Sequence, residues 1–366
     1  MKRFLKRGAA ALSLVVAASQ AWAEGPPSAA GAPQLPQSLR GMMTLGRAGL
    51  LPEYFSNDQF GTVQGRIADM RVTTASAHSP GAPQTGYEDG GHALVLAPSY
   101  TKLLNDGKSA LRFALSGTKT DGDPGIIEIN ADILRFDAQY IRFPSTQTML
   151  SFGVFGETSK AEVVGAGDLE RKGYGLRADV LHQMSDHWGL VARAEYSFGQ
   201  SKGALNTPFG LLTRSQGDDR LYAHAMLVGQ YRNADLAAVP QGWVLHPQLG
   251  LQFQRNFIEE TTDSFGNVVS GAVGKTETYS TAFAKLRLQK EAGIGQWAPG
   301  MHIGIEHELT NDLDEYVDEP TYGLLGLTVS RQLSRNARFD LVYTLHQGLN
   351  GNRSNDTLVT ALSFVF

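Results

Sequence analysis

The feature that most constrains this chain is a two-residue alternation of apolar and polar side chains that recurs along most of its length. From Trp243 to Phe253 every second residue is apolar, and the positions between them hold Val, His, Gln and Gly. From Phe339 to His346 large apolar residues alternate with Asp, Val, Thr and His. A period of two is that of a β-strand with two unlike faces, whereas a helix repeats every 3.6 residues. The sequence therefore predicts an all-β fold.

Fourteen such segments follow one another from Phe60 to the last residue. Short polar turns such as 105–107 and 185–186 alternate with longer polar connections such as 158–172 and 200–217. Short turns at one end and long loops at the other are typical of strands arranged up and down in sequence order. The approximate bounds are 61–76, 91–103, 108–119, 126–142, 147–158, 172–184, 187–200, 218–233, 243–257, 275–290, 299–310, 320–333, 336–348 and 355–366.

Composition favours a barrel in a membrane over a soluble β-sandwich, which is the alternative. The mean hydropathy is −0.20 and the chain holds 41 glycines, as expected when only every second strand residue faces lipid. Aromatic residues such as Trp188 and Phe198 lie near segment ends, where the two membrane interfaces would be. We therefore predict a transmembrane antiparallel up-and-down β-barrel over residues 60–366. It should have 12–14 strands, with fourteen as the best count, short periplasmic turns and longer extracellular loops.

The first 23 residues have the pattern of a secretory signal peptide. A basic stretch over 1–7 precedes an apolar run over 9–18 and the cleavage motif Ala21-Trp22-Ala23. The apolar run is far shorter than the ~20 residues that span a bilayer as a helix. We therefore expect export, with a mature chain that begins at Glu24.

Residues 24–59 are rich in Pro, Ala and Gly and are interpreted as a linker. Within it, 38–52 also fits a short helix, with a capping serine, an apolar side and a closing proline. Without the four basic residues of the signal peptide, 28 basic residues stand against 36 acidic ones, a formal net charge of −8. Such a charge disfavours nucleic acid as a partner, and the lack of cysteine excludes disulfides and thiolate metal sites.

The segment at 126–142 changes its apolar face midway. The apolar set moves from odd-numbered to even-numbered positions after Ile133. A β-bulge near Ile133 and Leu134 would restore one consistent lipid face. The two sets are Ile127, Ile129, Ala131 and Ile133, and then Leu134, Phe136, Ala138 and Tyr140.

If the large apolar residues face lipid, the opposite strand faces line the lumen with charges of both signs. Two interpretations stay open: a polar conduit, or cross-strand ion pairs that stiffen the barrel and fill its interior. The second is favoured because charges of mixed sign satisfy one another before they select a solute. The candidate lumen-lining residues are Arg112, Arg177, Asp179, Arg193, Glu195, Lys285, Arg287, Glu306 and Glu308, and the same faces carry His224, Arg232 and His302.

No set of residues indicates catalysis. The histidines are scattered over separate segments, and none stands with a nucleophile and an acidic residue in a recognisable arrangement. Acidic runs at 121–128 and 311–319 lack the rest of a calcium loop and are interpreted as solvated loops. We therefore predict a protein that is not an enzyme, with no catalytic residue, no cofactor and no metal site.

The last segment ends on an aromatic residue. Leu358, Leu362, Phe364 and Phe366 share one face, and smaller residues occupy the other. This ending resembles the terminal strand of bacterial outer-membrane β-barrels. The resemblance implies that these four residues face outer-membrane lipid and form an insertion signal for the barrel-insertion machinery. We expect this strand to pair with the first one, which would leave no free edge in the membrane.

Four further stretches, 243–253, 263–266, 304–309 and 361–366, together resemble the β-domain of autotransporters (type V secretion). The resemblance covers roughly 170–366. It implies a twelve-stranded barrel with a helix threaded through its pore, which would translocate or display an N-terminal passenger. Residues 38–52 would supply that pore helix. Only about 37 residues separate Glu24 from Phe60, so the long repetitive passenger of the family has no counterpart here.

Two functions follow from this interpretation. The first is an integral outer-membrane barrel resembling an autotransporter translocator domain but without a long passenger. The alternative is a porin-like passive diffusion channel for small solutes. The sequence identifies neither a solute nor a passenger.

Overall fold

A computed structural model describes residues 90–106, 108–122, 129–145, 148–163, 167–207, 210–266, 268–269, 276–311, 319–334, 337–351 and 354–365. The predicted signal peptide, the linker at 24–59 with its helix at 38–52, and the first predicted strand at 61–76 lie outside the described residues. Within the described ranges, no helix is long and apolar enough to cross a membrane.

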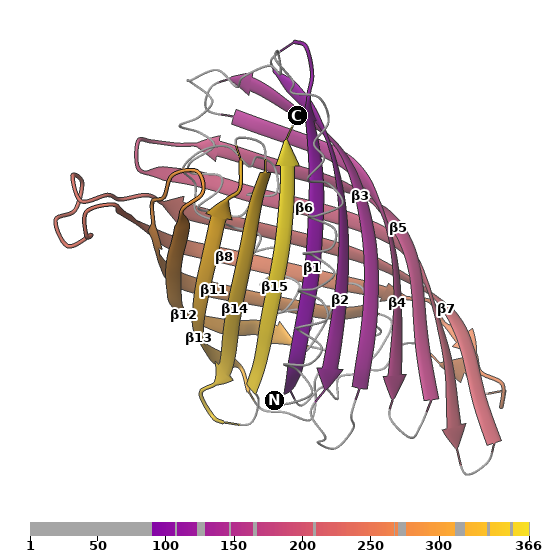
Figure 1. Cartoon of the computed structure of the whole chain (residues 1–366). Helices are drawn as coiled ribbons and strands as arrows, with labels where there is room; N and C mark the ends of the chain where they lie inside the picture. The colour runs from indigo at the N-terminus through magenta and orange to yellow at the C-terminus, as the bar shows by residue number, and fades with distance from the viewer. Residues whose placement is uncertain are drawn as a thin grey trace. The chain divides into compact units, whose positions relative to one another are not determined.

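The described strands form a closed barrel (Figure 1). Thirteen strands make up its wall, and they coincide with thirteen of the fourteen predicted segments. A separate two-stranded sheet joins β9 (Thr261–Thr262) to β10 (Val268–Val269). The wall strands are β1 (Gly90–Leu103), β2 (Ser109–Gly122), β3 (Ile129–Ser145), β4 (Thr148–Val163), β5 (Gly167–Gln183), β6 (Trp188–Thr207), β7 (Gly210–Gly229), β8 (Trp243–Ile258), β11 (Thr276–Lys290), β12 (Trp297–Asn311), β13 (Thr321–Gln332), β14 (Ala337–Gly348) and β15 (Ser354–Val365).

The barrel closes through a parallel pair, which differs from the expected all-antiparallel wall. Figure 1 shows β15 beside β1, and Leu358 lies opposite Leu94 while Phe364 lies opposite Tyr100. All other neighbouring wall strands are antiparallel. The cause is the odd number of described wall strands, because the first and last strands of an up-and-down series then run in the same direction. The last strand is expected to pair with the first predicted strand, 61–76, which lies outside the described residues; among the described strands it pairs with β1, the second predicted segment.

The two faces of the wall invert the usual distribution of polarity. On β5, Tyr174 and Leu176 are 68% and 60% exposed, whereas Arg177 and Asp179 on the other face are 4% and 1% exposed. The same contrast of exposed apolar and buried polar residues recurs on the other wall strands. A surface this apolar is stable only against lipid. The structure is therefore the predicted transmembrane barrel rather than a soluble sandwich.

The apolar outer band has the height of a membrane. Trp188 and Phe198, both on the outward face of β6, are ten positions apart. A rise of ~3.3 Å per residue and a tilt of ~40° place them about 25 Å apart along the membrane normal. Phe198 stacks on Tyr174 at 5.5 Å, and near the other end Trp297 contacts Phe339 edge-on at 6.4 Å. Aromatic rings thus mark both borders of the band.

Several strands continue beyond this band, where the sequence predicts loops. The expected loops at 158–172 and 200–217 are mostly strand, because β4 to β7 run on to short connections at 164–166 and 208–209. Outward residues there are charged, with Lys160 and Asp168 3.8 Å apart. Outside lipid neither face must be apolar, so the alternation fades while the hydrogen-bonded ladder continues.

The predicted β-bulge near Ile133 and Leu134 is wrong. Strand β3 pairs with β2 in continuous register from Asn130 to Arg142, and its only register shift against β4 lies between Arg142 and Ser145. Ile133 faces inward and is 8% exposed, whereas Leu134 faces outward and is 51% exposed. The apolar set changes sides because β3 leaves the lipid band at this height, not because the strand is kinked.

At the opposite end of the wall, two connections are longer than the others, those at 230–242 and 291–296. These two are joined, since Arg232 Nη2 lies 2.9 Å from Glu291 Oε1 and the backbone N–H of Glu291 donates to the carbonyl of Gly242 at 2.8 Å. Arg232 was expected on a lumen face. It lies in the connection instead, because β7 ends at Gly229.

Candidate functional site

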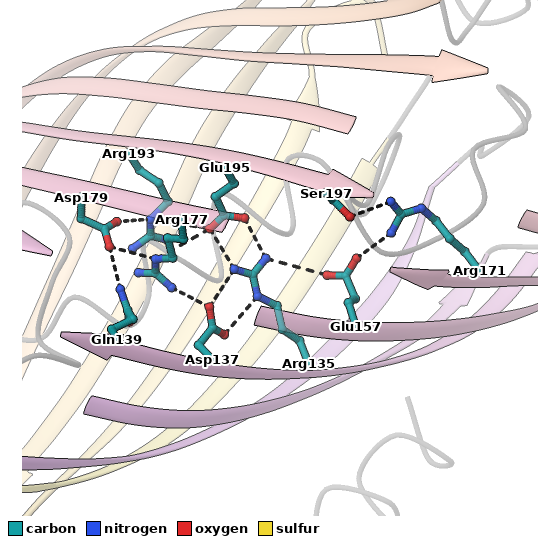
Figure 2. Close-up of polar contacts among 10 residues, drawn as sticks. All are labelled: Arg135, Asp137, Gln139, Glu157, Arg171, Arg177, Asp179, Arg193, Glu195 and Ser197. Carbon is teal, nitrogen blue, oxygen red and sulfur yellow. Dashed lines mark hydrogen bonds and ion pairs between the residues drawn. The ribbon is translucent and has the colours of Figure 1, made fainter. Parts of the chain in front are cut away.

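A continuous network of ion pairs and hydrogen bonds covers the inward faces of β2 to β7, and Figure 2 shows its central part on β3 to β6. We call it the ion-pair belt. On several strands it uses the same local pattern, an arginine and an acidic residue two positions apart, which a strand places on one face. The belt consists of Arg112, Arg135, Asp137, Glu157, Arg171, Arg177, Asp179, Arg193, Glu195, Asp218 and Arg220.

Arg135 lies at the centre of the belt. Its Nη2 is 2.8 Å from Asp137 Oδ1, its Nη1 is 2.8 Å from Glu195 Oε2, and its guanidinium carbon lies 3.8 Å from the centre of the Phe155 ring. The side chain is buried, as are both carboxylates. A guanidinium suits this position because its planar fork can bind two carboxylates and stack on an aromatic ring at once.

On one side of Arg135 the belt contains two further arginines, Arg177 and Arg193. They share the acidic residues of three strands. Arg177 lies 3.0 Å from Asp137 and 2.9 Å from Asp179, and Arg193 donates to the other oxygen of Asp179. The amide of Gln139 extends the belt by donating to Asp179 at 2.8 Å. It also accepts a hydrogen bond from Arg112.

Toward the other side, Glu157 joins Arg135 to a second group. Arg171 lies 3.1 Å from Glu157 and 3.2 Å from Asp218, and it donates to the Ser197 hydroxyl at 2.9 Å. Asp218 in turn lies 2.6 Å from Arg220. Figure 2 shows Glu157 between Arg135 and Arg171. With the hydrogen bond from Arg112 to Gln139 at one end and the pair of Asp218 and Arg220 at the other, the belt is continuous from β2 to β7.

The belt is nearly neutral, with six arginines and five carboxylates. Removing one partner from a buried pair of this kind leaves an uncompensated charge and is strongly destabilising. The arrangement therefore favours a structural role over recognition of a charged solute. Among the described residues, no group of three or more His, Asp or Glu side chains is placed to hold a metal ion.

The nine predicted lumen-lining residues do not form one site. Five of them lie in the belt: Arg112, Arg177, Asp179, Arg193 and Glu195. The other four lie on β11 and β12, where Lys285, Arg287 and Glu306 are buried and Glu308 is half-buried. There Arg287 donates to Gln289 at 2.8 Å, and Glu308 accepts a hydrogen bond from Tyr279 at 3.4 Å.

Six belt residues are not among the predicted lumen-lining residues: Arg135, Asp137, Glu157, Arg171, Asp218 and Arg220. The repeated spacing of arginine and acid two positions apart, as in 135–137, 177–179, 193–195 and 218–220, was a signal that could have found four of them. Arg171 and Glu157 lack that signal, since each stands without an oppositely charged residue two positions away on its own strand.

The residues of the predicted insertion signal lie on the outward face of β15. Leu358, Leu362 and Phe364 are half-buried there, and the intervening Val359, Ala361 and Ser363 are buried. Phe366 lies outside the described residues.

Comparison with solved structures finds barrels of the same kind. The translocator domain of the autotransporter NalP from Neisseria meningitidis matches with a TM-score of 0.50 at 11% identity, over 78% of this chain and 90% of that domain. The β-domain of the Bordetella autotransporter BrkA matches with a TM-score of 0.49 at 12% identity, over 69% of this chain and 95% of that one. No family model matches the sequence, and no curated protein does.

The chain therefore has the fold of an autotransporter β-domain, as the sequence resemblance predicts. At such low identity the likeness establishes the fold alone, and function is a separate question.

Proposed function

We propose that this protein is an outer-membrane barrel of the translocator type, with the segment that precedes β1 held in or passed through its lumen. In this proposal residues 1–23 direct export, and Leu358, Leu362, Phe364 and Phe366 guide insertion by the barrel-insertion machinery. The proposal includes no enzymatic step.

The ion-pair belt is the observation that carries the proposal. Its carboxylates and arginines satisfy one another, with Arg135 bound to Asp137 and Glu195 at 2.8 Å each. A wall whose charges are already paired has few groups left to select a small ion. Such a wall can still hold its shape around a chain segment, which suits a translocator better than a selective channel.

Planar-bilayer conductance tests the proposal. We expect the purified full chain to have low conductance, and a variant lacking residues 24–58 to conduct more, because the lumen would then be open. High conductance that is unchanged by the deletion would instead support the alternative, a porin-like diffusion channel.

Surface proteolysis of whole cells tests whether the segment is displayed. Cleavage within residues 24–60 by an added protease requires those residues to be outside the cell. Protection of the segment in intact cells, together with cleavage after the membrane is permeabilised, would place it on the inner side and exclude display.

A further inference from the structure

A groove of about 660 Å³ lies where the strands continue beyond the lipid band, across β5, β6, β7 and the segment that follows β8. On the outward face, Glu170 of β5 lies opposite Lys202 of β6, which lies opposite Ser215 of β7. Lys202 stands four positions beyond Phe198 on the same face. A rise of ~3.3 Å per residue and a tilt of ~40° place it about 10 Å beyond the aromatic border. The groove is therefore accessible from water.

The segment 261–264 borders the groove and is held against β7 by hydrogen bonds. The backbone N–H of Ser264 donates to the carbonyl of Thr213 at 2.9 Å, and the backbone N–H of Thr213 donates to Ser264 Oγ at 2.9 Å. The Thr261 hydroxyl donates to the carbonyl of Ser215 at 2.8 Å. The border is thus fixed without a ligand, which lowers the ordering cost of binding one.

The lining of the groove is almost entirely polar. Of the twelve described residues that line it, ten have polar side chains, and the other two are Gly203 and Ala204. On the outward strand face Asp168, Glu170 and Lys202 supply charges of both signs, and all three are exposed. Five lining residues carry a hydroxyl group: Thr213, Ser215, Thr261, Thr262 and Ser264.

This lining suits a neutral ligand with many hydroxyl groups. Carboxylates accept hydrogen bonds, an ammonium donates them, and a hydroxyl of a sugar, like that of Ser or Thr, does both. An anionic ligand would lie against Asp168 and Glu170, and a cationic ligand would lie against Lys202. An apolar ligand would meet Ala204 as the one apolar side chain among the described lining residues. The volume lies within the range of small-molecule sites, ~300–1,000 Å³.

We propose that this groove binds a saccharide. Asp168 and Glu170 accept hydrogen bonds from sugar hydroxyls, Lys202 donates to them, and Thr262 adds a hydroxyl from the other side. Two sources offer this chemistry: the head group of a glycolipid in the surrounding membrane, and a glycan free in solution. The first source rests on the proposed outer-membrane location, and the second does not. The ion-pair belt and the lumen take no part in this site.

Calorimetric titration of the detergent-solubilised full chain tests the site with two probes. One probe is the core oligosaccharide of lipopolysaccharide, released from its lipid by mild acid and dephosphorylated. The other is maltoheptaose, a neutral glucan that is not part of a membrane. We expect at least one of them to bind saturably. Binding of the core oligosaccharide alone would identify a membrane glycolipid as the source, and binding of maltoheptaose would identify a site for free glycans.

Glu170→Gln should weaken the binding about ten-fold, because it replaces a charged acceptor with a neutral one of the same shape. Thr262→Ala, which removes one hydroxyl, should weaken it about three-fold. Asp132→Asn and Thr158→Ala are the matched controls and should leave the affinity unchanged. Both residues are exposed on the outward face outside the groove, and Asp132 lies in the same row as Glu170, since each is opposite Lys160.

The proposal is overturned if neither probe saturates the full chain, or if either folded groove variant binds as tightly as its control. Heat-modifiable mobility on gels identifies which variants are folded. The conductance test on residues 24–58 concerns the lumen, whereas this groove lies on the outward face, so the two proposals fail independently.

Discussion

Arg135 of β3 binds both carboxylate oxygens of Glu195 on β6, with Nη1 2.8 Å from Oε2 and Nη2 2.9 Å from Oε1. Two strands, β4 and β5, separate these residues in the wall. The contact therefore spans the inward surface rather than one strand pair. Both side chains are buried, so this two-pronged bond fixes the relative positions of four strands.

Arg135→Ala should destabilise the barrel by about 3–5 kcal/mol, because it leaves the buried carboxylates of Asp137 and Glu195 without their cation. Urea-induced unfolding in lipid vesicles, followed by tryptophan fluorescence, measures the change. Arg142→Ala on the same strand is the control, since Arg142 is exposed and its loss should cost no more than about 0.5 kcal/mol. Equal losses in the free energy of unfolding for the two substitutions would contradict a stabilising role of the belt.

Gly250→Ala should destabilise the barrel by about 1–3 kcal/mol through overpacking. A Cβ atom at Gly250 would lie 2.1 Å from the Phe283 ring, and that ring is buried against its neighbours. Gly117→Ala is the matched control, because a Cβ there meets nothing within 4 Å. The control should be neutral or slightly stabilising, and the same unfolding assay separates the two cases.

Leu176→Lys should destabilise the barrel by about 2–4 kcal/mol, since Leu176 lies within the outward apolar band and is 60% exposed to lipid. Thr158→Lys places the same charge on the outward face of β4 beyond the band and should cost at most about 1 kcal/mol. Folding yield into vesicles at increasing urea concentration measures both. A cost at Thr158 as large as that at Leu176 would contradict the assigned border of the membrane.

The turn between β1 and β2 should depend on pH through Asp106. The hydrogen bond from the Ser109 hydroxyl, and then that from the backbone N–H of Lys108, hold the pKa of the Asp106 carboxyl below its ordinary value of 3.8. A lowered pKa in the folded state means that this stabilisation is complete above the unfolded pKa and is lost as the pH falls through the folded one. In an NMR titration Ser109→Ala should raise the midpoint toward 3.8, and an unchanged midpoint would refute the assignment.

The sequence predicts most of this fold because, inside the lipid band, apolar outward residues alternate with polar inward residues along each wall strand. Strands such as β8 and β14 alternate cleanly, and their predicted bounds agree with the structure to within a residue or so. This alternation ends at the membrane border. The bulge expected near Ile133 and the loops expected at 158–172 and 200–217 are errors of this one kind, because strands outside lipid need no apolar face.

The interior was harder to predict than the wall. Alternation places Arg177, Asp179 and Glu195 on the inward face, but it does not say which strands their partners come from. Arg135 reaches across β4 and β5 to Glu195, and a contact over that distance depends on the curvature of the closed wall and on side-chain length. No local pattern in the sequence predicts the parallel pairing of β1 with β15, since the relative direction of these two strands depends on the number of strands in the wall.

Spin labelling along β13 tests the central claim, that the outward faces meet lipid and the inward faces do not. The chain has no cysteine, so single substitutions at 325, 327, 328, 329 and 330 can be labelled one at a time. Leu325, Leu327 and Val329 are exposed, and Thr328 and Ser330 are 2% and 1% exposed. In vesicles, collision with dissolved oxygen should peak at 325, 327 and 329 and fall at 328 and 330. Absence of this two-residue period, or peaks at 328 and 330, would contradict the account.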